Sequence, residues 1–211
     1  MTDGEAERRR GRPQDRTKRA NVLAAAQRLF MANGFARTSM DAIAEAAGVS
    51  KLTAYKYFGS KQALFAEAVA SKCRSAFEDD DVDYAADHDL RACLSSFGRA
   101  FLKLILDPDA IAVHRLIAVE RERTPELGPL FFDSAVKPTR DRLAAIIARH
   151  EAAGEITTGG DALLAAQQLL ALWRGRPLMT AELGLGVLDD AALAVHVEQS
   201  VDLCLQAWAR R

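Results

Sequence analysis

Apolar residues recur every three or four positions along most of this chain, which is the spacing of one buried face of an α-helix. From residue 89 onward every periodic segment is helical in this sense, and no segment alternates apolar and polar residues as a β-strand does. The pattern predicts an all-α fold of about nine helices without an internal repeat. With 49% hydrophobic residues among 211, the chain can bury one large core or two modest ones.

Proline, glycine and acidic residues mark where the predicted helices start and stop. Asp107 and Pro108 separate a helix over residues 90–106 from one over residues 109–123, because Asp caps a helix and Pro suits its first turn. A second start signal of this kind stands at residues 124–126. Further starts are predicted at Asp161 and Asp189, an interruption at Gly175 and Pro177, a break at Pro138, and other helices over residues 16–33, 61–77 and 140–153.

Residues 39–58, SMDAIAEAAGVSKLTAYKYF, contain two short helical patterns joined by a tight turn. Gly48 stands where the first helix must end, because a residue without Cβ can take the left-handed conformation of a helix C-cap. Ser50 is a good N-cap for the second helix. The layout is that of a helix-turn-helix, a motif whose second helix enters the major groove of DNA.

The charges in this stretch favour an anionic partner. Lys51 and Lys61 each fall on the first turn of a predicted helix, where the helix dipole favours acids over bases. A DNA phosphate at these positions would make the lysines favourable, because the backbone N–H groups, the helix dipole and the lysine would all attract the same anion. The alternative is an ordinary solvated face. The solvent side of the second helix carries donors and flat rings suited to base edges and phosphates, namely Lys51, Leu52, Thr53, Tyr55, Lys56 and Tyr57.

Residues 16–70 resemble the DNA-binding domain of TetR-type (TetR/AcrR) transcriptional regulators. The likeness rests on Asn33, Gly34 and Phe35 after an apolar helix, on the Ala-Gly-Val-Ser turn, and on the Tyr-Lys-Tyr-Phe segment before Ser60 and Lys61. It implies a bacterial repressor, a homodimer that binds a near-palindromic operator and is released by a small molecule. The DNA-binding residues predicted from the pattern and the resemblance are Arg10, Arg12, Thr38, Ser39, Lys51, Leu52, Thr53, Tyr55, Lys56, Tyr57 and Lys61.

We expect three regions along the chain. Residues 1–15 form a disordered basic arm, residues 16–62 the helix-turn-helix DNA-binding domain, and residues 63–211 a larger helical domain for ligand binding and dimerisation. The arm is too polar to pack and is broken by Gly11 and Pro13. It either enters the minor groove beside the helix-turn-helix or stays a solvated tail that adds only non-specific attraction.

The net charge of −1 hides a division along the chain. Residues 1–61 carry 12 Lys and Arg against 6 Asp and Glu, whereas residues 62–211 carry 16 against 23. A basic N-terminal lobe on an acidic body suits a protein that places one end on a polyanion.

Other classes of function find little support in the sequence. No apolar run reaches the roughly 18–20 residues of a membrane span, and the N-terminus lacks the apolar core of a secretory signal, so we expect a cytoplasmic protein. No nucleotide-binding or metal-binding motif is present, and we expect no enzyme, no cofactor and no metal. Cys73, Cys93 and Cys204 are interpreted as reduced core residues, with a redox sensor as the alternative.

The C-terminal domain carries aromatic residues that suit a mainly apolar effector, although the same residues suit a solid core. From Phe97 onward this domain resembles the ligand domain of AefR-like regulators. The predicted ligand-binding residues are Phe97, Phe101, Ile105, His114, Ile117, Phe131 and Trp173.

The last two predicted helices carry more apolar residues than one face can bury against its own chain. A second copy would cover the excess across a twofold axis, and ordinary core packing in a monomer is the alternative. The predicted dimer interface consists of Leu169, Leu170, Trp173, Val197, Val201, Leu205 and Trp208.

These observations predict a sequence-specific DNA-binding transcriptional regulator whose partners are operator DNA, a second copy and a small-molecule effector. That it represses follows from the resemblance alone. The alternative function is an effector-independent DNA-binding dimer whose C-terminal domain serves only dimerisation or protein docking.

Overall fold

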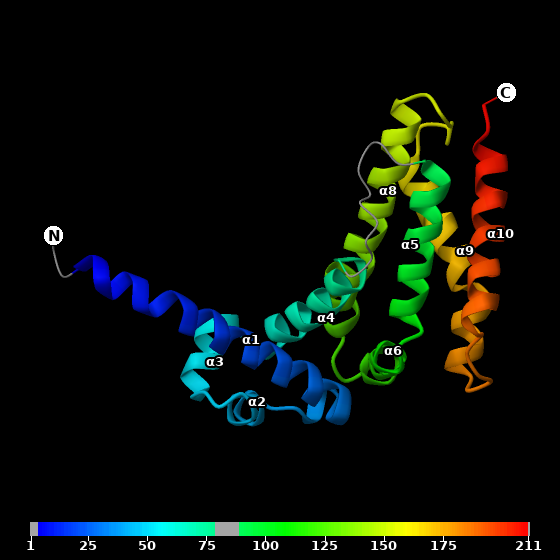
Figure 1. The fold of residues 1–211 in the computed structure, drawn as a ribbon. Helices are drawn as coiled ribbons and strands as arrows, with labels where there is room; N and C mark the ends of the chain where they lie inside the picture. The colour runs from blue at the N-terminus through cyan, green and yellow to red at the C-terminus, as the bar shows by residue number, and fades with distance from the viewer. Residues whose placement is uncertain (1–3, 79–88, 211) are drawn as a thin grey trace. The chain divides into compact units, whose positions relative to one another are not determined.

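The computed structural model describes residues 4–78 and 89–210, with side chains from Asp15 onward. These residues form helices and turns, and the predicted all-α fold is confirmed (Figure 1). The helices are α1 (Gly4–Arg37), α2 (Met40–Ala46), α3 (Lys51–Phe58), α4 (Lys61–Glu78), α5 (Leu90–Ile105), α6 (Pro108–Glu120), α7 (Leu127–Phe131), a π-helical turn (Phe132–Val136), α8 (Lys137–Ala152), α9 (Ala162–Glu182) and α10 (Asp190–Trp208).

The chain divides into two compact units. Unit 1 comprises Met1–Ser71 and Leu116–Ser134, and unit 2 comprises Lys72–Arg115 and Ala135–Arg211. Helices α1, α2 and α3 therefore belong to unit 1, and α5, α8, α9 and α10 belong to unit 2. The division falls inside α4.

Three phenylalanine rings form the centre of unit 1. Helix α1 is interrupted at Gly34, whose φ of 78° and ψ of 169° are not helical, as the sequence predicted. Phe35 follows this break and packs with Phe30 and Phe65, all three ring pairs having centroids 5.3–5.7 Å apart. None of the three side chains is more than 3% exposed. Phe35 thus fills the small core between α1 and α4.

Helix α1 also begins earlier than the predicted start at Arg16, since it runs from Gly4. The side chains of residues 1–14 lie outside the described residues. The predicted roles of Arg10 and Arg12 therefore stay predictions.

Asp161 and Asp189, two of the predicted start signals, are helix caps in the structure, as is Asp89, whereas the predicted start at residues 124–126 has no side-chain cap. The carboxylates of Asp89, Asp161 and Asp189 each accept the backbone N–H three residues further on, at 3.2, 2.8 and 2.8 Å. An aspartate at this position satisfies one of the free donors of a helix N-terminus. The starts of α5, α9 and α10 are therefore set locally, each by its aspartate cap.

The break predicted at Pro138 is wrong, and the chain stays helical there. Helix α7, the π-helical turn and α8 follow one another directly, with Pro138 in the first turn of α8. A proline is tolerated at this position because the first N–H groups of a helix need no partner within it. Counting this run once gives nine helices among the described residues, as predicted.

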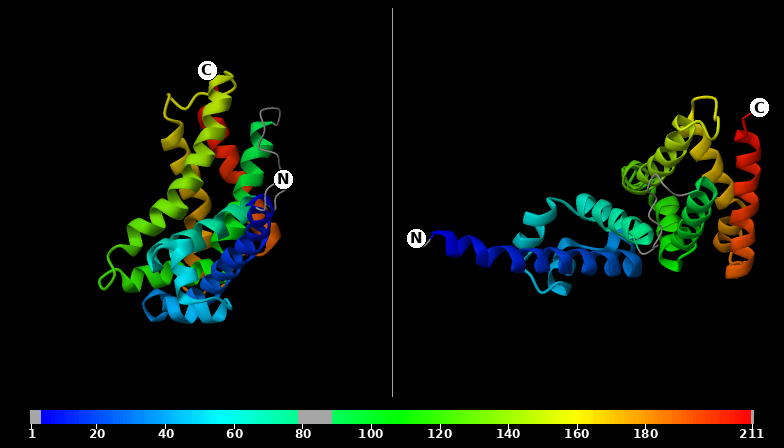
Figure 2. Two further views of the ribbon diagram at one scale, coloured as in Figure 1. Left: turned by 90° about the vertical axis from the view of Figure 1, so that its left-hand side faces the viewer. Right: turned by 45° about the horizontal axis from the view of Figure 1, so that its top comes forward.

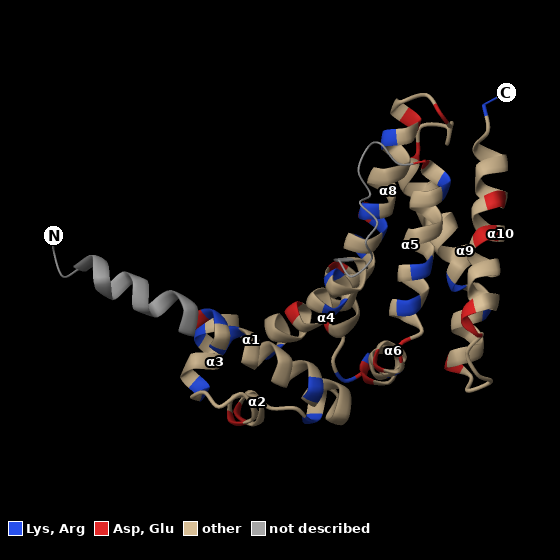
Figure 3. Ribbon diagram, viewed as in Figure 1, with Lys and Arg blue, Asp and Glu red and all other residues tan. Residues whose placement is uncertain are grey.

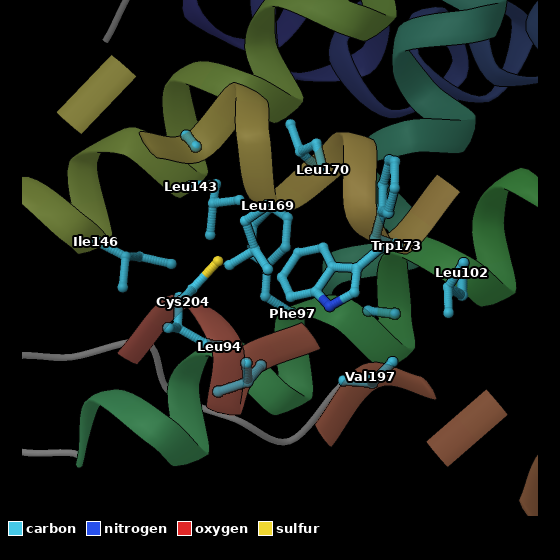
Figure 4. Packing of buried hydrophobic residues seen from close by; sticks show 14 of the residues in the cluster. Leu94, Phe97, Leu102, Leu143, Ile146, Leu169, Leu170, Trp173, Val197 and Cys204 are labelled. Atoms are coloured by element: carbon cyan, nitrogen blue, oxygen red, sulfur yellow. The ribbon is translucent and has the colours of Figure 1, made fainter. Parts of the chain in front are cut away.

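Unit 2 is built from α5, α8, α9 and α10, which pack on one another, and both views in Figure 2 show α10 alongside α9. Trp173 of α9 is fully buried at the centre of this core, with its ring centroid 6.2 Å from those of Phe97 and Phe101 (Figure 4). Gly98 allows α5 to approach so closely, since a Cβ there would lie 2.8 Å from Trp173 and Val197. The core is tightly packed at this point.

Helix α9 contains the predicted interruption. Gly175 has non-helical angles, φ −20° and ψ −110°, and Pro177 follows it inside the same helix. The helix resumes and continues to Glu182. No described helix is long and apolar enough to cross a membrane.

Candidate nucleic-acid interface

Helices α2 and α3 and the turn between them form the predicted helix-turn-helix. The hydroxyl of Ser39 accepts the N–H of Ala42 at 3.1 Å, and that of Ser50 accepts the N–H of Thr53 at 3.2 Å. Each helix therefore starts at a serine cap. Gly48 has a φ of 67°, the left-handed conformation that the turn requires. Local hydrogen bonds and one glycine thus fix how the chain passes from α2 into α3.

The two faces of α3 differ sharply in exposure. Ala54 and Phe58 are buried, as is Ile43 of α2. On the other face Leu52 is 80% exposed and Tyr55 is 40% exposed. Burying a leucine fully is worth about 1.5–3 kcal/mol, so Leu52 contributes little to folding where it lies. Its position suits contact with something outside the chain, such as a thymine methyl group.

Lys51, at the start of α3, is held by an acid on α2. Its ammonium lies 2.9 Å from Oδ1 and 3.0 Å from Oδ2 of Asp41. The hydrogen bond from Lys51 to Asp41 raises the pKa of the lysine, so Lys51 is charged at neutral pH. Both side chains remain more than half exposed, at 58% and 63%. An anion from solution can therefore reach the lysine.

Tyr57 and Lys61 also have partners within unit 1. The Tyr57 hydroxyl donates a hydrogen bond to the carboxylate of Asp15 on α1, and this bond raises the pKa of the tyrosine. The Lys61 ammonium donates to the backbone oxygen of Phe35 at 2.9 Å and lies 4.2 Å from the centre of the Phe35 ring. Burial lowers the pKa of Lys61. Lys61 thus stabilises the end of α1 as well as carrying charge at the start of α4.

The side chain of Thr38 is buried and bonds to the backbone of its own unit. Its side chain is 2% exposed, and its hydroxyl lies within hydrogen-bonding distance of the backbone oxygens of Leu29, at 3.0 Å, and Gly34, at 2.7 Å. These carbonyls belong to the end of α1, where the helix breaks. The buried hydroxyl has no exposed surface for DNA, so Thr38 has no place in the interface proposed below.

The remaining predicted DNA-binding residues lie on exposed parts of the motif. Tyr55 and Lys56 are exposed on α3, and Thr53 is half-buried with its hydroxyl 2.8 Å from that of Ser50. Figure 3 shows basic residues on α1 and α3 and acidic residues on α2. Two acids that the sequence pattern did not single out, Asp41 of α2 and Asp15 of α1, bind Lys51 and Tyr57. Asp41 and Asp15 are distant in sequence from Lys51 and Tyr57, and no local pattern pairs them.

The predicted ligand-binding residues are divided between the two units. The structure brings together Phe97, Phe101 and Trp173 in the core of unit 2, and Ile105 is buried in the same core. His114 is half-buried with Nδ1 3.9 Å from Oε1 of Glu182, and burial lowers its pKa. Two of the predicted residues, Ile117 and Phe131, belong to unit 1.

The residues predicted at the dimer interface are mostly core residues of their own chain. Leu169, Trp173 and Val197 are fully buried within unit 2, and Leu205 is half-buried. A side chain buried within one chain has no surface to offer a second copy. The apolar residues that α9 and α10 leave in solvent are Leu163, Leu164, Leu172, Met179, Val195 and Leu203.

A capped helix-turn-helix that exposes lysines, tyrosines and a leucine on its second helix defines a DNA-binding protein. Residues 22–68 match the family described as bacterial regulatory proteins, tetR family. Residues 92–210 match the C-terminal domain of AefR-like transcriptional repressors. The chain belongs to the TetR family of helix-turn-helix transcriptional regulators, which is not a family of enzymes.

Individual relatives agree with this assignment. The chain is similar to the flavonoid-responsive regulator FrrA, with 38% identity, a TM-score of 0.74, and coverage of 92% of this chain and 98% of that one. It is also similar to a TetR-family regulator from Mesorhizobium loti, with 27% identity, a TM-score of 0.75 and coverage of 93% and 98%. Over 57 residues it is 46% identical to EthR of Mycolicibacterium smegmatis, a match that spans 27% of this chain and only 26% of EthR.

The buried hydroxyl of Thr38 gives a first prediction. Thr38→Val should lower the free energy of unfolding by about 1–2 kcal/mol, because the hydrogen bond that the buried hydroxyl donates to the backbone at the end of α1 is lost. Thr53→Val, at a surface where water can replace the lost partner, should change it by no more than about 0.5 kcal/mol. Urea denaturation at matched protein concentrations measures both. Equal effects of the two substitutions would contradict a structural role for the Thr38 hydroxyl.

Proposed function

We propose that this regulator is a dimeric repressor that binds a near-palindromic operator and leaves it when a mainly apolar effector binds the C-terminal domain. The observation that carries the proposal is the outer face of α3, which holds Leu52 at 80% exposure between Lys51 and Tyr55. A single exposed leucine is common on protein surfaces, but here it stands among exposed side chains of the kind that contact base edges and phosphates, those of Lys51, Tyr55 and Lys56.

In this proposal α3 lies in the major groove. Leu52 and Tyr55 contact base edges and thymine methyl groups, while Lys51, Lys56 and Lys61 contact phosphates. The start of α2 at Ser39, with its free N–H groups, is suited to a further phosphate. One helix of this length reads few base pairs, so two copies related by a twofold axis would read half-sites about one turn of DNA apart.

We place the dimer surface on the outer faces of α9 and α10. Leu164 and Leu172 on α9 are 47% and 38% exposed, and Val195 and Leu203 on α10 are 55% and 56% exposed. The members of each pair are eight residues apart, which places them about 80° apart around the helix and so within one broad face. A second copy would remove these apolar surfaces from water.

The placement predicts that Leu203→Arg raises the dimer dissociation constant at least about tenfold, since a twofold interface would bury two unpaired charges. Multi-angle light scattering over a dilution series measures the change. The variant should also bind a duplex with an inverted repeat from the DNA flanking the gene more weakly. Val119→Arg is the control, because Val119 is 75% exposed but lies in unit 1. Unchanged dimerisation of Leu203→Arg, or equal weakening by both variants, would refute this placement.

The core of unit 2 suggests what an effector must offer. The indole N–H of Trp173 is fully buried and has no hydrogen-bond partner among the described residues. Buried indole N–H groups usually find a partner, so this donor lacks an acceptor. The rings of Phe97 and Phe101 lie beside it. A flat apolar molecule with a carbonyl or hydroxyl oxygen would satisfy both features once the side chains of this tightly packed core moved apart to admit it, and flavonoids, to which the relative FrrA responds, are of this kind.

An effector of this class should stabilise the protein and release it from DNA. At about 100 times its dissociation constant, ligand binding adds about 2.7 kcal/mol, which corresponds to roughly 5–10 °C in Tm for a chain of this size. Thermal unfolding against a panel of flavonoids measures the shift, with stearoyl-CoA as a non-planar comparison. Trp173→Phe should weaken flavonoid binding by roughly twofold to tenfold, because the ring remains but the donor is lost.

The alternative function predicts a different result in the same experiment. Tight DNA binding that no compound changes, together with no thermal shift, would favour an effector-independent dimer whose C-terminal domain serves only dimerisation or protein docking. If a compound shifted Tm equally in the wild type and in Trp173→Phe, the protein would have an effector, but Trp173 would not be part of its binding site.

A further inference from the structure

We propose that Asp41 is a specificity-determining residue, whose carboxylate holds the Lys51 ammonium until a correctly placed operator phosphate takes its place. The proposal rests on the proposed function of α3 as the DNA-reading helix. In this proposal an acid within the DNA-binding surface lowers the affinity for DNA other than the operator.

In the free protein the Asp41 carboxylate binds Lys51 in the way that a DNA phosphate would. The Asp41 carboxylate binds the ammonium almost symmetrically, at 2.9 and 3.0 Å from its two oxygens. A DNA phosphate also presents two equivalent oxygens to a lysine. Because Asp41 and Lys51 are 63% and 58% exposed, a phosphate can approach and exchange with the carboxylate.

Asp41 lies in the first turn of α2, where the helix dipole favours an acid, but this placement does not require a lysine beside it. Ser39 already caps α2 by accepting the N–H of Ala42. An exposed ion pair between side chains of this kind contributes little to folding. Lys51 itself stands at the start of α3, where the dipole disfavours a cation, so Asp41 mainly offsets the cost of keeping a lysine there.

A second donor on α3 has the same kind of partner. The Tyr57 hydroxyl donates to the carboxylate of Asp15, which lies on α1. Two polar groups at opposite ends of α3 are therefore bound to carboxylates that come from different helices. At Lys51 the acid occupies the place where the proposed complex has a phosphate.

The exchange favours the operator over other sequences for a geometric reason. When the bases match, α3 settles in the groove and a phosphate reaches Lys51, so the lysine trades one anion for another. In a mismatched complex the phosphate stays farther away and Lys51 remains with Asp41. The carboxylate then repels the DNA backbone without compensation. Asp41 therefore costs more affinity on the wrong sequence than on the right one.

The test compares Asp41→Asn with Glu45→Gln, which removes the same charge from an exposed side chain on the same helix. The probes are a duplex with the inverted repeat from the DNA flanking the gene and a mixed-sequence duplex of equal length. Asp41→Asn should raise affinity for the mixed-sequence duplex about threefold to fivefold and for the inverted repeat less than about twofold. Glu45→Gln should raise both by the same smaller factor.

A double-mutant cycle with Lys51→Met isolates the pair. In the Lys51→Met background, Asp41→Asn should have no more effect than Glu45→Gln. Equal gains on both duplexes, a loss of affinity on both, or an effect that persists without Lys51 would each overturn the proposal. Circular dichroism of each variant confirms that the protein is folded.

Failure of the proposed function gives a different result. A wild-type protein that does not prefer the inverted repeat over the mixed-sequence duplex would refute sequence-specific binding at that repeat. The comparison of Asp41→Asn and Glu45→Gln on the mixed-sequence duplex would still show whether Asp41 lowers the affinity of Lys51 for DNA.

Discussion

The packing of three phenylalanine rings is the constraint on which the DNA-facing part of the molecule depends. Phe30, Phe35 and Phe65 hold the end of α1 against α4, with ring centroids 5.3–5.7 Å apart. The break at Gly34 turns the chain so that Phe35 enters this core. Gly34 has a φ of 78°, a conformation that suits a residue without Cβ. Thr38 and Lys61 then bond the carbonyl groups that the broken helix exposes. Helices α2 and α3 start from this fixed platform.

The polar side chains of unit 1 that are proposed to contact DNA must also find partners within the protein when no DNA is bound. The lysines at the starts of α3 and α4 stand where a helix dipole disfavours them. In the free protein Asp41 and the Phe35 carbonyl group offset this cost. Lys61 is more deeply held than Lys51, since burial lowers its pKa and a ring lies beneath it. Lys51, exposed and paired with an exposed acid side chain, is the group better suited to exchange its partner.

Features set by neighbouring residues could be predicted from the sequence, and features set by distant residues could not. The serine and aspartate caps, the turn at Gly48 and the breaks at Gly34 and Gly175 each depend on a few adjacent positions. Periodicity could not tell which apolar face of α9 and α10 lies inside, because both helices are apolar on two sides. Leu169 and Val197 therefore proved to be core, and Leu172 and Leu203 exposed. The acids that hold Lys51 and Tyr57 were overlooked because folding, not sequence spacing, brings them there.

The central claim is that the outer face of α3 meets double-stranded DNA. Methyl and amide NMR spectra of the full chain, recorded while a duplex with the inverted repeat is added at low ionic strength, test it most directly. The account predicts that the Leu52 methyl signals and the backbone signals of Lys51 and Tyr55 shift, while those of buried Ala54 shift much less. Spectra in which the α3 signals stay unchanged as other surfaces respond to the DNA would contradict it.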